Sequence, residues 1–175
     1  NLPDMVGLLL DNGAELNASD RDGYTPLHIA IDQNSFNAAD ELLAAGADVN
    51  SRAEWNHTPL HTSVASGSMQ MVKKIMTEGG EINAKDRLGR TPLHWAAEKG
   101  HLKIAKFLIS NGSDINALDN EGETPMHDAA QWDKKEIVEL LIAIKADIHV
   151  QGSDGRAPLH LAIANGNIDI VDLLK

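Results

Sequence analysis

The chain has 175 residues, and its 26 acidic against 15 basic side chains give a formal charge of −11, which argues against general binding to a phosphate backbone or an anionic membrane surface. It contains no cysteine, which excludes disulfides, thiol nucleophiles and cysteine-ligated zinc. No apolar run approaches the roughly 20 residues of a membrane-spanning helix and no signal-peptide pattern opens the chain, so we expect a soluble intracellular protein.

Proline recurs along the chain at a fixed spacing. Apart from Pro3, each proline follows the previous one by 33 residues and stands in a motif of the type Thr-Pro-Leu-His. A second motif, Gly-Ala-Asp-Val-Asn in its clearest form at residues 46–50, keeps the same frame. The five prolines of the series are Pro26, Pro59, Pro92, Pro125 and Pro158. An internal repeat of 33 residues therefore organises the whole chain.

Each repeat predicts two helices followed by a turn. Threonine is a good N-cap and proline fits the first helical position, so the first helix begins there and runs, for example, from Pro92 to Lys99. It ends at a glycine such as Gly100, which accepts a left-handed backbone. The second helix carries apolar pairs four residues apart and ends at a glycine such as Gly112. The stretch that follows is rich in turn residues and predicts a projecting β-turn or hairpin.

One such helical hairpin cannot bury its own apolar stripe, whereas a stack of copies can. We therefore expect an all-α solenoid of stacked helix-turn-helix units with projecting turns, forming a single array over residues 1–175. The predicted units are a half repeat (1–19), four full repeats (20–52, 53–85, 86–118 and 119–151) and a truncated repeat (152–175). Because neither end carries a polar capping repeat, we interpret the chain as a piece of a longer array.

On these motifs the chain resembles the ankyrin-repeat proteins, whose units carry T-P-L-H-x-A at a period of 33 residues, and the resemblance covers the entire chain. It implies that the motif histidines join neighbouring turns by hydrogen bonds. It also places the large aromatic residues Trp95 and Phe107 in the core between repeats. His57 and His61 lie four residues apart and are the alternative, a metal pair, but no third ligand completes it in the sequence, so we expect no metal.

The resemblance also implies a concave binding face, built from the turn tips and the exposed side of the first helices. Aromatic and arginine side chains at such positions are typical of interface hot spots. The alternative is that each aromatic simply covers a neighbouring turn. The residues expected to bind a partner are Tyr24, Trp55, His57, Leu88, Arg90, Glu123, Gln131 and Trp132. The turn asparagines occupy the position that an asparaginyl hydroxylase can modify in this family, which makes hydroxylation a hypothesis for Asn17, Asn50, Asn83 and Asn116.

Four positions depart from the repeat pattern. Asn56 replaces a turn glycine, Lys145 replaces a helix-ending glycine, His149 replaces a turn asparagine, and Ala157 replaces the capping threonine. Asparagine tolerates a left-handed backbone, whereas the lysine and the lost cap each cost about 1 kcal/mol. We therefore expect the C-terminal third of the chain to be the less stable end.

No catalytic or nucleotide-binding motif is present, so we expect no enzyme activity and no cofactor. The sequence favours a monomeric, non-catalytic module that presents a rigid concave surface to another protein, with a basic partner surface suggested by the acidic charge. It favours neither nucleic acid nor membrane as a partner. We expect it in the cytoplasm or nucleus, or delivered into a host cell as an effector. The alternatives are a regulatory or targeting segment of a larger protein (an enzyme, a channel, a ubiquitin-ligase adaptor or a bacterial effector) and a scaffold with no single ligand.

Overall fold

The computed structural model describes residues 4–175, which form short paired helices and no β-strand. This confirms the predicted all-α class. Residues 1–3 of the predicted half repeat lie outside the described residues. Contacts divide the chain into two compact units, Asn1–Glu81 (unit 1) and Ile82–Lys175 (unit 2).

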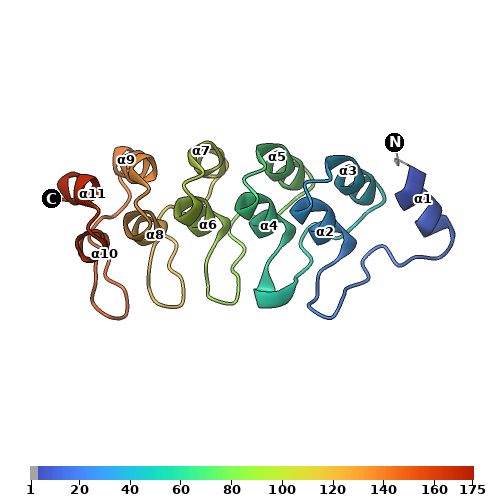
Figure 1. Cartoon of the computed structure of the whole chain (residues 1–175), viewed down its shortest axis with the longest axis horizontal. Coiled ribbons are helices and arrows are strands. Elements are labelled where there is room, and N and C mark those ends of the chain that lie inside the picture. The colour runs from blue at the N-terminus through green and yellow to red at the C-terminus, as the bar shows by residue number, and fades with distance from the viewer. Residues whose placement is uncertain (1–3) are drawn as a thin grey trace. The chain divides into compact units, whose positions relative to one another are not determined.

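Unit 1 contains two first helices that pack on each other, α2 and α4, and each also packs on the second helix of its own repeat, α3 or α5. The helix α1 packs on α3 and so belongs to the row of second helices (Figure 1). The elements are α1 (Asp4–Asp11), α2 (Pro26–Asp32), α3 (Phe36–Ala44), the 3-10 turn η1 (Glu54–Asn56), α4 (Pro59–Ala65) and α5 (Met69–Thr77).

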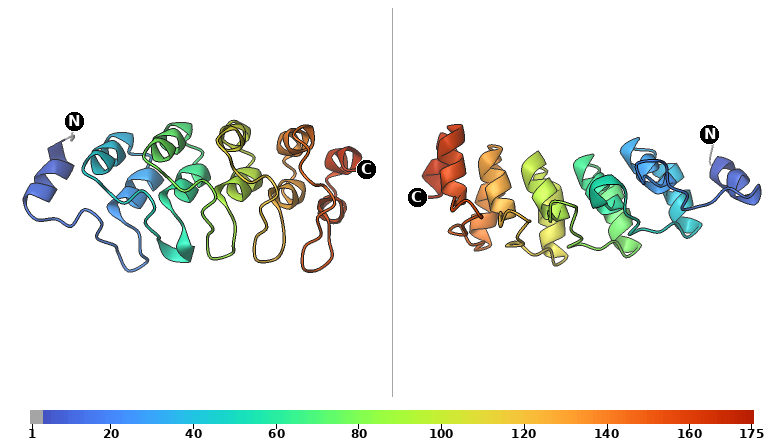
Figure 2. Two further views of the ribbon diagram at one scale, coloured as in Figure 1. Left: turned by 180° about the vertical axis from the view of Figure 1, so that it is seen from behind. Right: turned by 90° about the horizontal axis from the view of Figure 1, so that it is seen from below.

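Unit 2 repeats the same arrangement. Its first helices form one row in which α8 packs on both α6 and α10, and its second helices form another in which α9 packs on α7 and α11. The loops that precede the first helices project on one side of this unit (Figure 2). The helices are α6 (Pro92–Lys99), α7 (Leu102–Ser110), α8 (Pro125–Gln131), α9 (Lys135–Ala143), α10 (Pro158–Asn165) and α11 (Ile168–Leu173).

The first helices begin where the threonine–proline pairs predict, and the motif histidine secures each start. The backbone N–H of Thr91 donates to Nδ1 of His94 at 3.0 Å, so the proton of this ring lies on Nε2. That Nε2 donates to the carbonyl of Glu123 in the next loop at 3.2 Å. His28 and His127 make equivalent bonds to the carbonyls of His57 and Arg156. This confirms that motif histidines join neighbouring turns.

Burial keeps these histidines neutral. It lowers the pKa of His94 to about 4, and it also lowers the pKa of His28 and of His127. A neutral ring matches the hydrogen-bond pattern, because Nδ1 must accept while Nε2 donates. Each of these three histidines thus holds the loop of the following repeat against the preceding helix.

The ends of the helices also follow the predicted pattern. Gly100 ends α6 with a φ of 73°, and Asn56 and Lys145 both adopt a φ of 63°, as expected for residues that replace left-handed glycines. The sequence did not predict the left-handed backbone of Trp55, whose φ is 58°, or of Asp133, whose φ is 54°. A left-handed backbone at an aromatic residue destabilises the fold by about 1–2 kcal/mol, so the loop that carries Trp55 is strained.

Candidate functional site

The loops before α6 and α8, together with the exposed side of α8, enclose a pocket of about 240 Å³ in unit 2. We call it the acidic pocket, because its lining contains several carboxyl groups and one arginine. Five of the residues predicted to bind a partner line it: Leu88, Arg90, Glu123, Gln131 and Trp132. The other lining residues are Glu98, Asp119, Asn120, Glu121 and Asp128.

One wall of the acidic pocket is built around Arg90. Its Nη1 donates to Oε2 of Glu98 at 2.7 Å, and its Nε lies 3.4 Å from Oδ2 of Asp86. The guanidinium also lies 4.6 Å from the ring centroid of Trp95, whose indole N–H donates to Asp86 at 3.0 Å. Arg90 is therefore held by its own repeat. Trp95 and Phe107, both predicted for the core between repeats, are half-buried, and neither belongs to the buried core.

The floor of the acidic pocket is a rigid pair of loops. Oδ1 of Asp119 accepts the backbone N–H groups of Glu121 and Glu123 at 2.9 and 2.8 Å, which shapes the turn between them. The backbone N–H of Asn120 donates to the carbonyl of Leu88 at 2.9 Å and joins this turn to the preceding one. The turns therefore hold their shape through hydrogen bonds within unit 2.

Two half-buried carboxyl groups in the acidic pocket have no donor. Within residues 4–175, no hydrogen bond or ion pair reaches the side chain of Glu123 or Asp128, and both side chains are half-buried. Burial raises the pKa of Asp128 well above its usual range, and burial together with neighbouring Asp119 raises the pKa of Glu123. Beside them, Trp132 and Leu88 expose 51% and 49% of their surface, so the acidic pocket has an apolar rim.

The other three residues predicted to bind a partner lie in unit 1. Tyr24 packs edge-on against His28, with ring centroids 5.8 Å apart. Trp55 is 48% exposed at the left-handed turn of its loop. The rings of His57 and His61 stack at 6.0 Å, and within residues 4–175 no group of three potential ligands could hold a metal ion.

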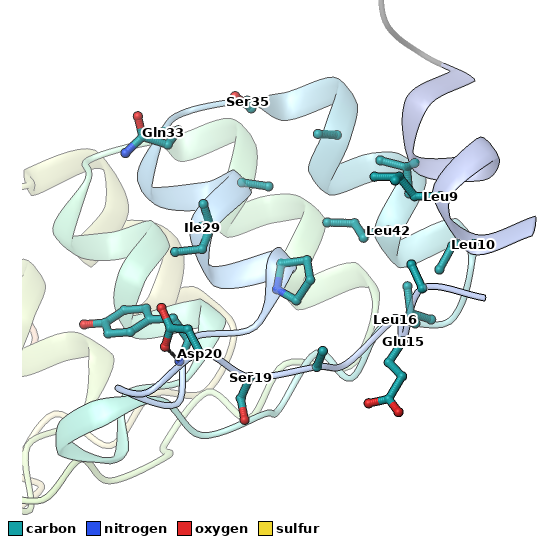
Figure 3. A pocket seen from close by; sticks show the side chains of 17 residues that line it. Leu9, Leu10, Glu15, Leu16, Ser19, Asp20, Ile29, Gln33, Ser35 and Leu42 are labelled. Atoms are coloured by element: carbon teal, nitrogen blue, oxygen red, sulfur yellow. Dashed lines mark hydrogen bonds between the residues drawn. The ribbon is translucent and has the colours of Figure 1, made fainter. Parts of the chain in front are cut away.

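Unit 1 also has a pocket, of about 590 Å³, which we call the apolar pocket. It lies between α1, α2 and α3, and Figure 3 shows Leu9, Ile29 and Leu42 around it. Tyr24 contributes to its lining. Most of its surface is hydrocarbon, although five polar residues also line it: Glu15, Ser19, Asp20, Gln33 and Ser35.

The turn asparagines have a structural role. Oδ1 of Asn50 accepts the backbone N–H of Glu81 at 2.9 Å while its Nδ2 donates to the carbonyl of Gly79 at 3.1 Å. Asn83 bonds in the same way to Asp114 and Gly112. Asn17 and Asn116 likewise accept the backbone N–H of Asp48 and of Asp147. A hydroxylase would have to release these bonds to reach the side chains, and hydroxylation stays a hypothesis.

Asp128 is the lining residue that the sequence interpretation missed. Aligning the repeats at their 33-residue spacing places it in one column with Ile29, Thr62, Trp95 and Leu161. It is the only ionisable member of that column. The sequence did contain a signal for this residue: Asp128 places a charge on a side of the first helix where the other repeats have none.

Comparison with protein families agrees with the repeat pattern. A family model described as ankyrin repeats in three copies matches residues 52–119 and 111–175, and a second, described as ankyrin repeats in many copies, matches residues 9–63. No curated protein matches the chain. Across residues 4–175, every helix is too short or too polar to cross a bilayer.

Proposed function

Because the chain belongs to the ankyrin-repeat family, we propose that it is a protein-binding module and that the acidic pocket of unit 2 is the centre of its binding surface. Ankyrin repeats are generally protein interaction modules and are typically non-catalytic. The single observation that carries the proposal is the grouping of exposed Trp132 and Leu88 around two carboxyl groups without donors. Large apolar side chains beside polar groups are typical of binding hot spots.

The rigidity of the surface also supports this function. Arg90 is fixed by Glu98 and Trp95, and the loop that carries Glu123 is fixed by His94. A surface that is ordered before association loses little conformational entropy when a partner binds. The formal charge of −11 favours a basic partner surface, because opposite charges speed the encounter.

Site-specific crosslinking tests the proposal. A photoreactive phenylalanine analogue would replace Trp132 in one version of the protein and Glu139, an exposed residue of α9, in another. We expect a partner crosslinked from position 132 and not from position 139. With that partner purified, Trp132→Ala should weaken binding about tenfold or more, whereas Glu139→Ala should leave it unchanged. Equal crosslinking from both positions would refute the acidic pocket as the binding centre.

A further inference from the structure

The acidic pocket has an unusual balance of satisfied and unsatisfied charge. Its one cation, Arg90, is occupied by Glu98 at 2.7 Å, and Oδ1 of Asp119 is occupied by two backbone N–H groups. The side-chain carboxyl groups of Asp128 and Glu123 accept no hydrogen bond within the described residues. Withdrawing a carboxylate from water without a donor is costly, so the fold by itself gives no reason for Asp128.

We propose that the acidic pocket binds an arginine side chain of the partner protein, with the guanidinium placed between Asp128 and Glu123 and against the indole of Trp132. This inference rests on the proposed function, since it names the chemistry of the partner at the same site. The guanidinium would supply the donors that the two carboxyl groups lack.

Unit 2 already shows this mode of binding one repeat earlier. There, the guanidinium of Arg90 lies between the carboxylates of Asp86 and Glu98 and over the ring of Trp95. In the next repeat, the position of Arg90 is held by Glu123, and no arginine of this chain lines the acidic pocket except Arg90 itself. The acidic pocket thus combines carboxylates with an aromatic side chain, as the Arg90 site does, but lacks the arginine between them.

Arginine fits these groups better than lysine. Two half-buried carboxyl groups and one exposed indole require a ligand that offers several donors in one plane and a flat face for stacking. The ammonium of lysine is a compact point charge and cannot meet both needs at once. A metal ion is less suitable, because no three acidic or histidine side chains among residues 4–175 are placed to hold one together.

Nuclear magnetic resonance titration of the whole chain tests this inference. The probe is the peptide acetyl-Gly-Arg-Gly-amide, compared with the same peptide carrying citrulline, the neutral isostere, or lysine. We expect saturable shifts of the Trp132 indole N–H and of the backbone amides of residues 119–123 with the arginine peptide. Citrulline should give no saturable shift, and lysine should bind at least about fivefold more weakly.

Two matched variants carry the control. Asp128→Asn should weaken binding of the arginine peptide at least about tenfold, because a charged acceptor is lost. Asp133→Asn makes the same charge change at an exposed residue outside the acidic pocket and should leave the affinity unchanged. Equal binding of the citrulline peptide, equal binding of lysine, or equal loss in both variants would overturn the arginine assignment.

The two proposals fail separately. If the partner crosslinks from position 132 but the arginine peptide does not bind, the module function stands and the arginine assignment falls. If the arginine peptide binds but no partner crosslinks from position 132, the acidic pocket has the proposed chemistry and the proposed function falls.

Discussion

The two units contain pockets of opposite chemistry. The apolar pocket of unit 1, at about 590 Å³, is lined by hydrocarbon from residues such as Leu9, Ile29 and Leu42, whereas five of the ten residues that line the acidic pocket of unit 2, at about 240 Å³, carry a carboxyl group. In unit 1, α2 packs on α4 on one side, and the apolar pocket lies where a further first helix would pack. Part of its lining is buried in other repeats, because Pro26 is half-buried here while the aligned Pro59 and Pro92 are buried.

The two pockets differ in whether the fold accounts for their residues. A stack of repeats needs apolar contact faces, so the incomplete cover of a residue such as Pro26 follows from the architecture alone. A half-buried carboxyl group without a donor, such as Asp128, lowers stability and serves no contact within the described unit. Residues that violate the folding pattern without compensation mark functional sites, and that is the basis for preferring the acidic pocket.

The largest effect should come from His94, because it ties the loop of the acidic pocket to α6. His94→Ala leaves the N–H of Thr91 and the carbonyl of Glu123 without their partner and creates a cavity, which should cost about 3 kcal/mol. His28→Ala is the matched change in unit 1 and should cost stability there without weakening the arginine peptide. Denaturant unfolding measures the stability lost in each variant, and hydrogen exchange of residues 119–123 measures how firmly the loop is held. Unchanged exchange of these residues in His94→Ala would contradict the role of His94 in holding the loop.

The same histidine predicts acid sensitivity. The pKa of His94 is about 4 when folded, against about 6.5 in the unfolded chain, so the unfolded state binds more protons between these values. The stability that His94 contributes is complete above pH ~6.5 and decreases by up to about 3 kcal/mol as the pH falls towards 4. Unfolding at several pH values should show a smaller slope in this range for His94→Ala.

The next largest effect concerns the contact between the two loops of the acidic pocket. Gly89 has a φ of 78°, and a Cβ there would lie 2.5 Å from Oδ1 and 2.8 Å from the backbone N of Asn120. Gly155 has the same φ with open space around it. Gly89→Ala should therefore cost about 2–3 kcal/mol and Gly155→Ala about 1 kcal/mol in denaturant unfolding. Equal costs would mean that the loop contact contributes nothing.

Much of the fold was predictable because its signals are local. A threonine followed by Pro92 starts a helix and Gly100 ends it through short-range capping and backbone chemistry, so the repeat period located the helices. The roles of the motif histidines followed from the family resemblance. The left-handed backbone of Trp55 carried no such signal, because tryptophan does not favour it. Asp133, in contrast, stands at the position of the helix-ending glycines Gly67 and Gly100, and aspartate tolerates this backbone, a signal that the sequence interpretation missed.

The candidate site was less predictable because it depends on which side chains meet in space. Arg90 was expected to face a partner, yet it lines the acidic pocket while bound to Glu98 and stacked on Trp95. Trp95 differs from its expected core position for the same reason, since its indole N–H reaches Asp86. A polar side chain can be free to contact a partner or can be bound by its own repeat. Packing between the loop and the helix decides which, and the spacing of residues in the sequence does not reveal that packing.

A moderate effect is expected for Asp128→Asn. Because the pKa of Asp128 is raised in the folded state, the favourable contribution of this group exists below its ordinary pKa of about 3.9 and is lost as the pH rises through the raised value. Burial is the largest cause of the raised pKa of Asp128. The charged groups that act on it are Arg90, which lowers the pKa, and Glu98, Asp119 and Glu123, which raise it.

At neutral pH, Asp128→Asn should therefore stabilise unit 2 by about 1 kcal/mol while it weakens binding of the arginine peptide at least about tenfold. Asp133→Asn, at an exposed position, should change stability by no more than about 0.5 kcal/mol. Thermal unfolding of the three proteins at pH 7 measures the difference. If Asp128→Asn were less stable than the wild type, the carboxyl group of Asp128 would have a favourable partner in the native state. The acidic pocket would then no longer differ from the apolar pocket by containing a carboxyl group that lowers stability.

The smallest effect on stability is expected in the apolar pocket. Ile29 is 46% exposed at its edge, so Ile29→Gln should change the free energy of unfolding by no more than about 0.5 kcal/mol. The polar side chain should nevertheless reduce the fluorescence of bound anilinonaphthalene sulfonate, a dye for open apolar surfaces, whereas Ile163→Gln, at a position 59% exposed in unit 2, should not. A cost above about 1 kcal/mol for Ile29→Gln would mean that this side chain is part of the buried core. The apolar pocket would then not be an open apolar surface, and the two units would not differ in the way described.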